Sequence, residues 1–328
     1  MLKTENIINR VGRVDKTYNI LTFNTHERYQ SQLAKTGHNF YAFTYEGGKD
    51  WYSGHAPMPD NYYVLPKNSM YPAINFDLII SNSKFGQFQT ADQINRSLQI
   101  PIISLEHTLP LQSWPEQQLN AFQSMSGDID VFITEYSKKA WGMKGEVVYH
   151  SIDTDFFRPA EISHPHRENI ILTVAHDFIN RDYALNYQGW KRITEGLDRK
   201  VIGETEGLSE QSNSVEDLIS EYQNALIYIN PSVLSPVPTS LLEAMSCGCA
   251  IVTTETCEIP NIIKHGVNGF MSNDEAELRK YCEQLLADPQ LAIKMGEAAR
   301  ETIKEKFSQN RFVDEWNKIF DKAYEVIK

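Results

Sequence analysis

The feature that most constrains the fold is a regular alternation of short apolar runs with segments of helical periodicity. The apolar runs have the length and composition of buried strands, and the segments between them place apolar residues at helical spacing. This alternation is typical of parallel α/β architecture, in which helices connect successive strands of a sheet. The runs lie at Tyr18–Phe23, His38–Thr44, Asp77–Ser81, Ile100–Leu105, Asp130–Thr134, Asn169–Ala175, Lys200–Gly203, Ala225–Asn230 and Cys249–Thr254.

A chain of 328 residues exceeds one comfortable hydrophobic core, so two domains of about 150 residues are expected. The turn-rich segment Val147–Pro159, with a proline- and histidine-containing stretch after it, marks the boundary. We therefore expect two doubly wound, Rossmann-like α/β domains, residues 1–152 and 153–308, that face a central cleft. An amphipathic helix over 309–328 is expected to pack back toward the first domain. Ligands of such sheets bind beyond the carboxyl ends of the strands, which here means in the cleft.

Charge is distributed unevenly along the chain. Residues 1–150 contain 13 Lys/Arg against 14 Asp/Glu, whereas the remainder contains 18 against 29. The acidic second half argues against wrapping a polyanion over the whole surface, while the near-neutral first half leaves a local polyanion site open. The charged first residues do not resemble a signal peptide, and no apolar run approaches the roughly 18 residues needed to span a bilayer. We expect a cytoplasmic protein without a transmembrane segment.

Two kinds of pattern superficially resemble metal sites. Three cysteines between 247 and 257, followed by His265, have a spacing that matches none of the usual zinc sites, so they are interpreted as reduced thiols. Two Asp-x-Asp patterns occur at 128–130 and 153–155, but one leads into a strand and the other falls in the segment between domains. No metal ion is predicted.

The stretch SPVPTSLLEAMSCG, residues Ser235–Gly248, opens a helix after a buried strand. Ser240 and Glu243 have the spacing of a capping box, in which each side chain satisfies the other residue's backbone amide. The same helix N-terminus offers free amides to an anion, and a diphosphate fits such a site. A carboxylate one turn into the helix could then accept hydrogen bonds from a sugar's vicinal hydroxyls. Local sequence leaves both interpretations open, and Gly248 suits the left-handed residue after the helix.

The segment YINPSVLSPVPTSLLEAMSCGCAIVTTETCEIPNIIKHGVNGFMS resembles the donor-binding half of a family 4 glycosyltransferase of GT-B fold. The family's features occur in order: a strand ending in Pro-Ser, the LLEAMSCG helix, the strand CAIVTT, and EIPNIIKHGVNGF. Upstream, VVYHSIDTDFFRP resembles the family's interdomain segment, and ITEYSKKAWGM resembles the helix before it. The resemblance is strong from about Asp130 to Phe270. It implies a retaining hexosyl- or pentosyltransferase that uses a nucleotide sugar, with a UDP-sugar as the expected co-substrate and no other cofactor.

The resemblance also implies a donor site around this helix start. Glu243 would be the second carboxylate of a Glu-x7-Glu pair and would bind the ribose of the donor. The first carboxylate would fall at Ser235, where this sequence has no acid, which puts the transferred sugar and the rate in question. The expected donor-binding residues here are Ser235, Val237, Thr239, Ser240, Leu241 and Glu243.

Basic residues after the first strand of the second domain neutralise the diphosphate in this family. Here His176 stands where an arginine is usual, and Arg181 where a lysine is usual. Arginine is a good diphosphate partner through its fork of donors, whereas a neutral imidazole supplies one donor only. A solvated surface charge is the alternative interpretation of Arg181. The helix start and Arg181 would stabilise the leaving diphosphate in place of a metal ion.

In the first domain, Glu106 and His107 end a buried strand and are expected to point at the cleft. The family has a histidine at a comparable strand end, facing the transferred sugar, so His107 is the best candidate there; a structural histidine is the alternative. Thr25, His26 and Arg28 stand near the place of a family glycine-rich loop and are weaker candidates. We expect His107, Arg181 and Glu243 to carry the chemistry.

The leading hypothesis is metal-independent transfer of a sugar from a nucleotide diphosphate to an acceptor held by the first domain. A catalytically weakened nucleotide-sugar-binding protein is the alternative suggested by Ser235, and a GT-B epimerase or phosphorylase is a third. The acceptor is open between a glycan, a small molecule and a modified nucleic-acid base. A loop is predicted over Tyr45–Pro66. Its aromatic part, Trp51–Tyr63, and Trp114 could stack on a sugar or a base, or serve only in core or lid packing. Basic residues that could serve a nucleic acid are Lys3, Arg10, Arg13 and Lys16.

Overall fold

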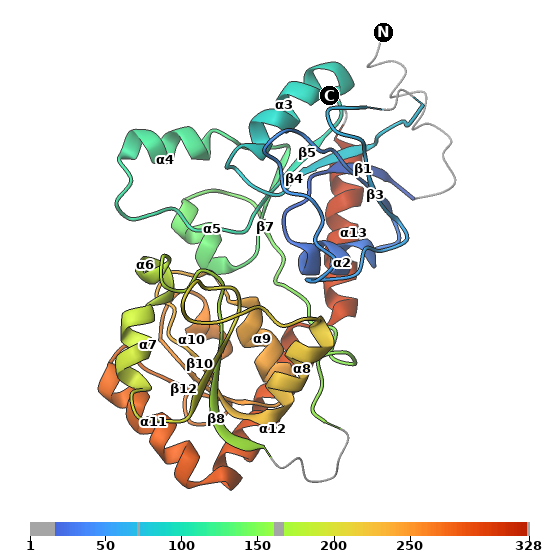
Figure 1. Ribbon diagram of the computed structural model, residues 1–328. Coiled ribbons are helices and arrows are strands. Elements are labelled where there is room, and N and C mark those ends of the chain that lie inside the picture. The colour runs from blue at the N-terminus through green and yellow to red at the C-terminus, as the bar shows by residue number, and fades with distance from the viewer. Residues whose placement is uncertain (1–16, 71–72, 161–166, 327–328) are drawn as a thin grey trace. The chain divides into compact units, whose positions relative to one another are not determined.

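The computed structural model describes residues 17–70, 73–160 and 167–326. These residues form two compact units. The first unit contains the described residues up to Tyr149 and those from Asn310 onward, and the second is His150–Gln309. Each unit is built on one parallel β-sheet with helices packed against it (Figure 1).

The sheet of the first unit has seven strands in the order β3-β2-β1-β4-β5-β6-β7, all paired in parallel. Every residue of β4 and β5 is buried, as expected for strands covered on both faces. The strands are β1 (Asn19–Thr22), β2 (Asn39–Ala42), β3 (Tyr62–Val64), β4 (Leu78–Ser81), β5 (Ile102–Glu106), β6 (Ile129–Phe132) and β7 (Glu146–Val147). The helices are α2 (Glu27–Ala34), α3 (Gln87–Leu98), α4 (Glu116–Gln123), α5 (Glu135–Trp141) and α13 (Gln309–Glu325), which begins at the unit boundary.

The sheet of the second unit has five strands in the order β12-β11-β10-β8-β9, also parallel. All residues of β10 and β11 are buried between the helices that flank them. The strands are β8 (Glu168–Val174), β9 (Arg199–Ile202), β10 (Ala225–Asn230), β11 (Ala250–Thr253) and β12 (Phe270–Met271). The helices are α6 (Asp182–Leu185), α7 (Tyr187–Ile193), α8 (Val215–Asn224), α9 (Thr239–Ser246), α10 (Ile259–Ile262), α11 (Glu275–Ala287) and α12 (Pro289–Lys306).

Helix α13 packs on the first unit although it follows the second in sequence (Figure 1, red). Its apolar side is buried, including Phe312 and Trp316. Trp316 donates its indole N–H to the hydroxyl of Tyr29 in α2 at 3.1 Å. Near the other end of the helix, the Tyr18 hydroxyl donates to Asp321 at 2.6 Å. These bonds join the last helix to α2 and to the residue that precedes β1.

The alternation of apolar runs predicted the α/β class correctly, but the prediction of an uninterrupted loop over Tyr45–Pro66 was wrong. Tyr62–Val64 forms the edge strand β3 and pairs with β2. The run Tyr62–Leu65 is short and is followed by a proline, and in this edge strand of three residues Tyr63 and Val64 are exposed. Cross-strand contacts such as Tyr41 on Tyr63, with ring centroids 5.1 Å apart, stabilise the pairing instead.

Among the helices of the described residues, none combines the length and apolar composition that a bilayer crossing requires.

Candidate functional site

The loop between β10 and α9, residues 231–238, begins at the carboxyl end of the second sheet. The Ser232 hydroxyl donates to the Asn230 side-chain oxygen at 2.9 Å, and the Asn230 amide donates to the Thr253 hydroxyl of β11 at 3.1 Å. All three side chains are buried. This chain of hydrogen bonds fixes the direction in which the loop leaves the sheet.

Arg181 stands beside a second anchor of the 231–238 loop. The backbone amide of Val233 donates to the carbonyl of Ala184 in α6 at 2.8 Å, and the Ala184 amide donates to the Arg181 carbonyl at 2.9 Å. The Arg181 side chain is exposed, and within the part of the chain that the structure describes it has no hydrogen bond or ion pair. Its guanidinium is therefore available to a ligand at this edge of the sheet.

Helix α9 starts without a side-chain cap, and the capping-box prediction was wrong. The residue before the helix is Pro238, whose side chain has no hydrogen-bond acceptor. Ser240 lies inside the first turn, where its hydroxyl accepts from the Tyr228 hydroxyl at 2.8 Å and donates to the Val174 carbonyl at 3.4 Å. The partial positive charge of the helix start is thus not neutralised by a capping side chain of the helix itself.

Glu243 lies in α9 with its side chain turned into the unit. It is fully buried, and its Oε2 accepts the hydroxyl of the equally buried Tyr222 in α8 at 3.0 Å. A ligand hydroxyl would have to share or replace this bond to reach that oxygen. Ribose binding by Glu243 therefore stays a prediction.

The helix end follows the sequence prediction. Cys247 is the C-cap, and Gly248 has a φ of 80°. A residue with a side chain is strained in this left-handed conformation, so glycine is the expected residue there.

His176 follows β8, and its ring is held by the end of β9. The Glu204 backbone amide donates to His176 Nδ1 at 3.2 Å, so the neutral ring has its hydrogen on Nε2. The contact depends on Gly203, which has a φ of 121° and whose added Cβ would lie 2.1 Å from the Ala175 carbonyl oxygen. A larger residue would push the two strand ends apart. His176 thus presents one fixed N–H donor.

The donor residues predicted from the sequence all lie at or near one edge of the second sheet. Strands β8 and β10 are parallel neighbours, so the residues that follow them meet at their carboxyl ends. The side chains of Val237 and Leu241 are buried, with exposed fractions of 4% and 0%, so only their backbones could contact a ligand. The polar residues His176, Arg181, Ser235, Thr239 and Ser240 follow β8 or β10 in the chain and so belong to this edge of the sheet.

His107 belongs to the first unit, at the carboxyl end of β5. Its ring packs against the rings of His26 and Tyr29, with centroid distances of 4.8 and 4.7 Å. Only 9% of the residue is exposed. This packing fits a structural histidine as well as a ligand-binding one.

Glu106 was expected to point at the cleft, and the structure gives it another role. Its carboxylate accepts from the amide and hydroxyl of Thr108, at 2.8 and 2.6 Å, and from the Lys84 amide at 3.1 Å. Burial raises the pKa of Glu106, although these hydrogen bonds act in the opposite direction. The side chain therefore fixes the turns after β4 and β5 and thereby the backbone on either side of His107.

The Asp-x-Asp patterns have local structural roles. Asp153 accepts the backbone amides of Asp155 and Phe156, at 3.2 and 3.1 Å, in a turn. Asp128 accepts the Ile102 amide at 2.8 Å. Over residues 17–70, 73–160 and 167–326, no group of three His, Cys, Asp or Glu side chains is arranged to hold an ion.

The cysteines are free thiols, and three of the four are buried. Burial raises the pKa of Cys247 and of Cys249. The basic residues considered for nucleic-acid binding, Lys3, Arg10, Arg13 and Lys16, lie outside the described residues.

The sequence of the second unit is similar to known glycosyltransferases. Residues 207–302 match the family described as glycosyl transferases group 1. Over 90 residues the chain is 36% identical to N-acetyl-alpha-D-glucosaminyl L-malate synthase of Bacillus anthracis, covering 27% of this chain and 23% of that protein. Over 107 residues it is 33% identical to alpha-maltose-1-phosphate synthase of Mycolicibacterium smegmatis, covering 30% and 28%. The chain thus matches about a quarter of the length of these curated relatives.

Solved structures extend the similarity to both units at the level of the fold. Sucrose-phosphate synthase from Thermosynechococcus elongatus superposes with a TM-score of 0.72 over 94% of this chain and 99% of its own, at 14% identity. HepE of Anabaena, solved in complex with UDP, gives 0.71 over 93% and 100%, at 12% identity. Residues 207–302 thus resemble the glycosyl transferases of group 1 in sequence, and the two parallel-sheet units have the GT-B fold.

Proposed function

We propose that the protein transfers a sugar from a nucleoside-diphosphate donor, bound at the start of α9, to an acceptor held by the first unit. The observation that carries the proposal is the uncapped start of α9 at the same sheet edge as Arg181, whose exposed guanidinium has no partner among the described residues. Backbone amides, a helix dipole and a guanidinium together form a site for a diphosphate.

A UDP-sugar is the donor that the comparisons favour. HepE of Anabaena has been solved with UDP, with UDP and glucose, and with UDP-glucose. The fold of HepE matches 93% of the length of this chain. The identity is only 11 to 12%, so this similarity supports the donor class and not a particular sugar.

In this proposal the second unit stabilises the leaving diphosphate electrostatically. The first-turn amides of α9, the Arg181 guanidinium and the Nε2–H of His176 would donate to phosphate oxygens as negative charge develops on them. These groups would supply the positive charge without a metal ion. We also propose that the anomeric configuration is retained, as the resemblance to family 4 implies.

Glu243 and Ser235 would divide recognition of the donor. Glu243 would take a ribose hydroxyl by exchanging its bond to Tyr222, and Ser235 would lie beside the transferred sugar. A serine offers a neutral hydroxyl where the family pattern has a carboxylate, so the sugar would be held by fewer charged hydrogen bonds.

The test is donor binding and transfer by matched arginine variants. Bound donor raises the melting temperature by mass action, so UDP-glucose is expected to stabilise the wild type. Arg181→Ala should lose most of this shift and lower turnover about 100-fold, in the range seen when one electrostatic donor is removed. Arg192→Ala removes another exposed guanidinium of the same unit, one that is paired with Glu275. This variant should keep both the thermal shift and the turnover of the wild type. A full shift in Arg181→Ala would show that the donor binds elsewhere.

A nucleotide-sugar-binding protein with weakened catalysis is the second candidate, favoured by the absence of an acid at Ser235. It predicts the same thermal shift with neither transfer nor release of the sugar. Release of UDP from UDP-glucose in the presence of any acceptor would exclude it.

A further inference from the structure

An aromatic cluster lies on the first unit, away from the buried core of its sheet. Phe85 follows β4, Trp114 follows β5, and Phe122 belongs to α4. The Trp114 and Phe122 rings stack with centroids 4.8 Å apart and an angle of 18° between planes, and Phe85 lies 4.7 Å from Phe122. Phe85 is 42% exposed, and the other two rings are partly exposed.

The aromatic cluster is connected to the turn that follows His107. Trp141 packs edge-on against Trp114 at 6.1 Å and donates its indole N–H to the Thr108 carbonyl at 2.9 Å. The cluster therefore lies at the carboxyl edge of the first sheet. This is the edge at which ligands of parallel sheets bind.

The chain segment that carries Trp114 and Phe122 is polar without being basic. Helix α4 has no buried residue. From Ser97 to Ser137 the sequence contains no lysine or arginine. Four exposed amide side chains lie on or next to α4: Gln112, Gln117, Gln118 and Asn120.

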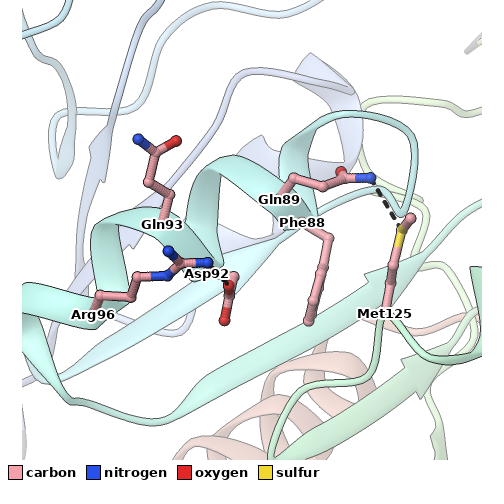
Figure 2. A pocket seen from close by; sticks show the side chains of 6 residues that line it. All are labelled: Phe88, Gln89, Asp92, Gln93, Arg96 and Met125. Atoms are coloured by element: carbon pink, nitrogen blue, oxygen red, sulfur yellow. Dashed lines mark hydrogen bonds and ion pairs between the residues drawn. The ribbon is translucent and has the colours of Figure 1, made fainter.

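A pocket of about 360 Å³ lies on the neighbouring α3 and reaches to Met125, three residues after Phe122. Figure 2 shows Gln89 of α3 reaching over to the Met125 sulfur, at 3.3 Å, and Arg96 beside Asp92, at 3.5 Å. The pocket is lined by Phe88, Gln89, Asp92, Gln93, Arg96 and Met125. Its volume is in the range of small-molecule sites, and its one cation is matched by one anion.

We propose that the aromatic cluster and the α3 pocket together bind a neutral glycan, the acceptor of the transfer proposed above. The C–H faces of sugar rings pack on exposed aromatic rings, and their hydroxyls take hydrogen bonds from amides and from a paired Asp and Arg. The absence of basic residues from Ser97 to Ser137 disfavours an anionic lipid surface or a nucleic acid, both of which need cations. Two adjoining subsites fit a chain of sugars better than a single one.

The experiment measures binding of maltotetraose, cellotetraose and N-acetylchitotetraose to the full-length chain by calorimetry. At least one is expected to bind, and Phe85→Ala should weaken it about tenfold through loss of a stacking ring. Phe156→Ala is the matched control, because Phe156 is a phenylalanine of similar exposure, 40%, that belongs to the second unit. It should leave the affinity unchanged. Gln93→Ala is a second variant. It tests the α3 pocket through an exposed side chain, so the core stays intact.

Three results would overturn the proposal: no binding of any of the three at millimolar concentration, equal binding by Phe85→Ala and wild type, or Phe85-dependent binding to vesicles of phosphatidylcholine and phosphatidylglycerol. The proposal rests on the proposed function, and the two can fail separately. A UDP-glucose thermal shift without oligosaccharide binding would contradict only the proposed glycan site. Oligosaccharide binding without that shift would contradict the proposed transferase activity and support a carbohydrate-binding surface.

Discussion

Helices α2 and α9 start at the carboxyl edges of the first and second sheets, and they differ in whether an acidic side chain lies at the positive helix end. Neither α2 nor α9 has a side-chain cap. Helix α2 carries Glu27 in its first turn, whereas the first turn of α9 contains no acid. The Glu27 carboxylate is buried and accepts from Lys49 at 2.9 Å, from the Tyr52 amide at 3.2 Å and from His55 at 3.1 Å.

The difference shows which helix start can receive an anion. At α2 a carboxylate of the chain already occupies the favourable position, and it ties the segment from Lys49 to His55 to the helix. At α9 no acidic side chain of the first turn takes this position, which fits the diphosphate site proposed above. The glycines that a phosphate-binding loop would need are also missing after β1. In the first unit, the segment from Lys49 to His55 contacts the carboxylate at the helix start instead.

The largest expected effect comes from making α9 resemble α2. Thr239→Glu places a carboxylate in the first turn, where it would repel a diphosphate. We expect UDP-glucose affinity to fall about 100-fold, roughly 2.7 kcal/mol, in a calorimetric titration. Thr239→Gln has nearly the same shape without the charge and should lose far less. Equal losses in the two variants would mean that shape, and not charge, decides binding at α9.

The converse change removes the internal anion of α2. Glu27→Gln keeps the size but loses the charge-assisted bonds to Lys49 and His55, so the free energy of unfolding should fall by about 1–3 kcal/mol. Urea denaturation measures it. Glu46→Gln, an exposed acid of the same loop region, is the control and should change stability by less than about 0.5 kcal/mol. An unchanged free energy of unfolding in Glu27→Gln would show that the contacts of Glu27 with Lys49 and His55 do not stabilise the fold.

A smaller effect is expected from pH. Burial alone would raise the pKa of Glu27, but the bonds from Lys49 and His55 hold it below its usual value. The folded state therefore binds the proton less readily than the unfolded chain, whose pKa is about 4.3. The stabilising contribution is complete above that pH and is lost as pH falls through the folded pKa. The stability difference between wild type and Glu27→Gln should shrink as pH falls from 6 to 3, and a constant difference would contradict this origin.

Much of the fold was determined by the sequence alone. Runs such as ALIYIN and IPIISL specify strands buried on both faces, and the order of runs and helical segments specifies two parallel sheets. The motif around 235–248 also located a helix start after a strand. These features follow from local periodicity, which a single pass along the chain contains.

The partners of the polar side chains were decided by tertiary structure. Ser240 forms its hydrogen bond with Tyr228 and not with Glu243. Glu243 accepts from Tyr222, and Glu27 accepts from Lys49, which lies 22 residues away in the sequence. A capping-box spacing cannot reveal this, because the competing partner comes from another strand or helix and its position depends on packing. Local sequence thus located the helix start at the carboxyl edge of the second sheet, while packing decided which acidic and basic side chains are buried and which stay exposed.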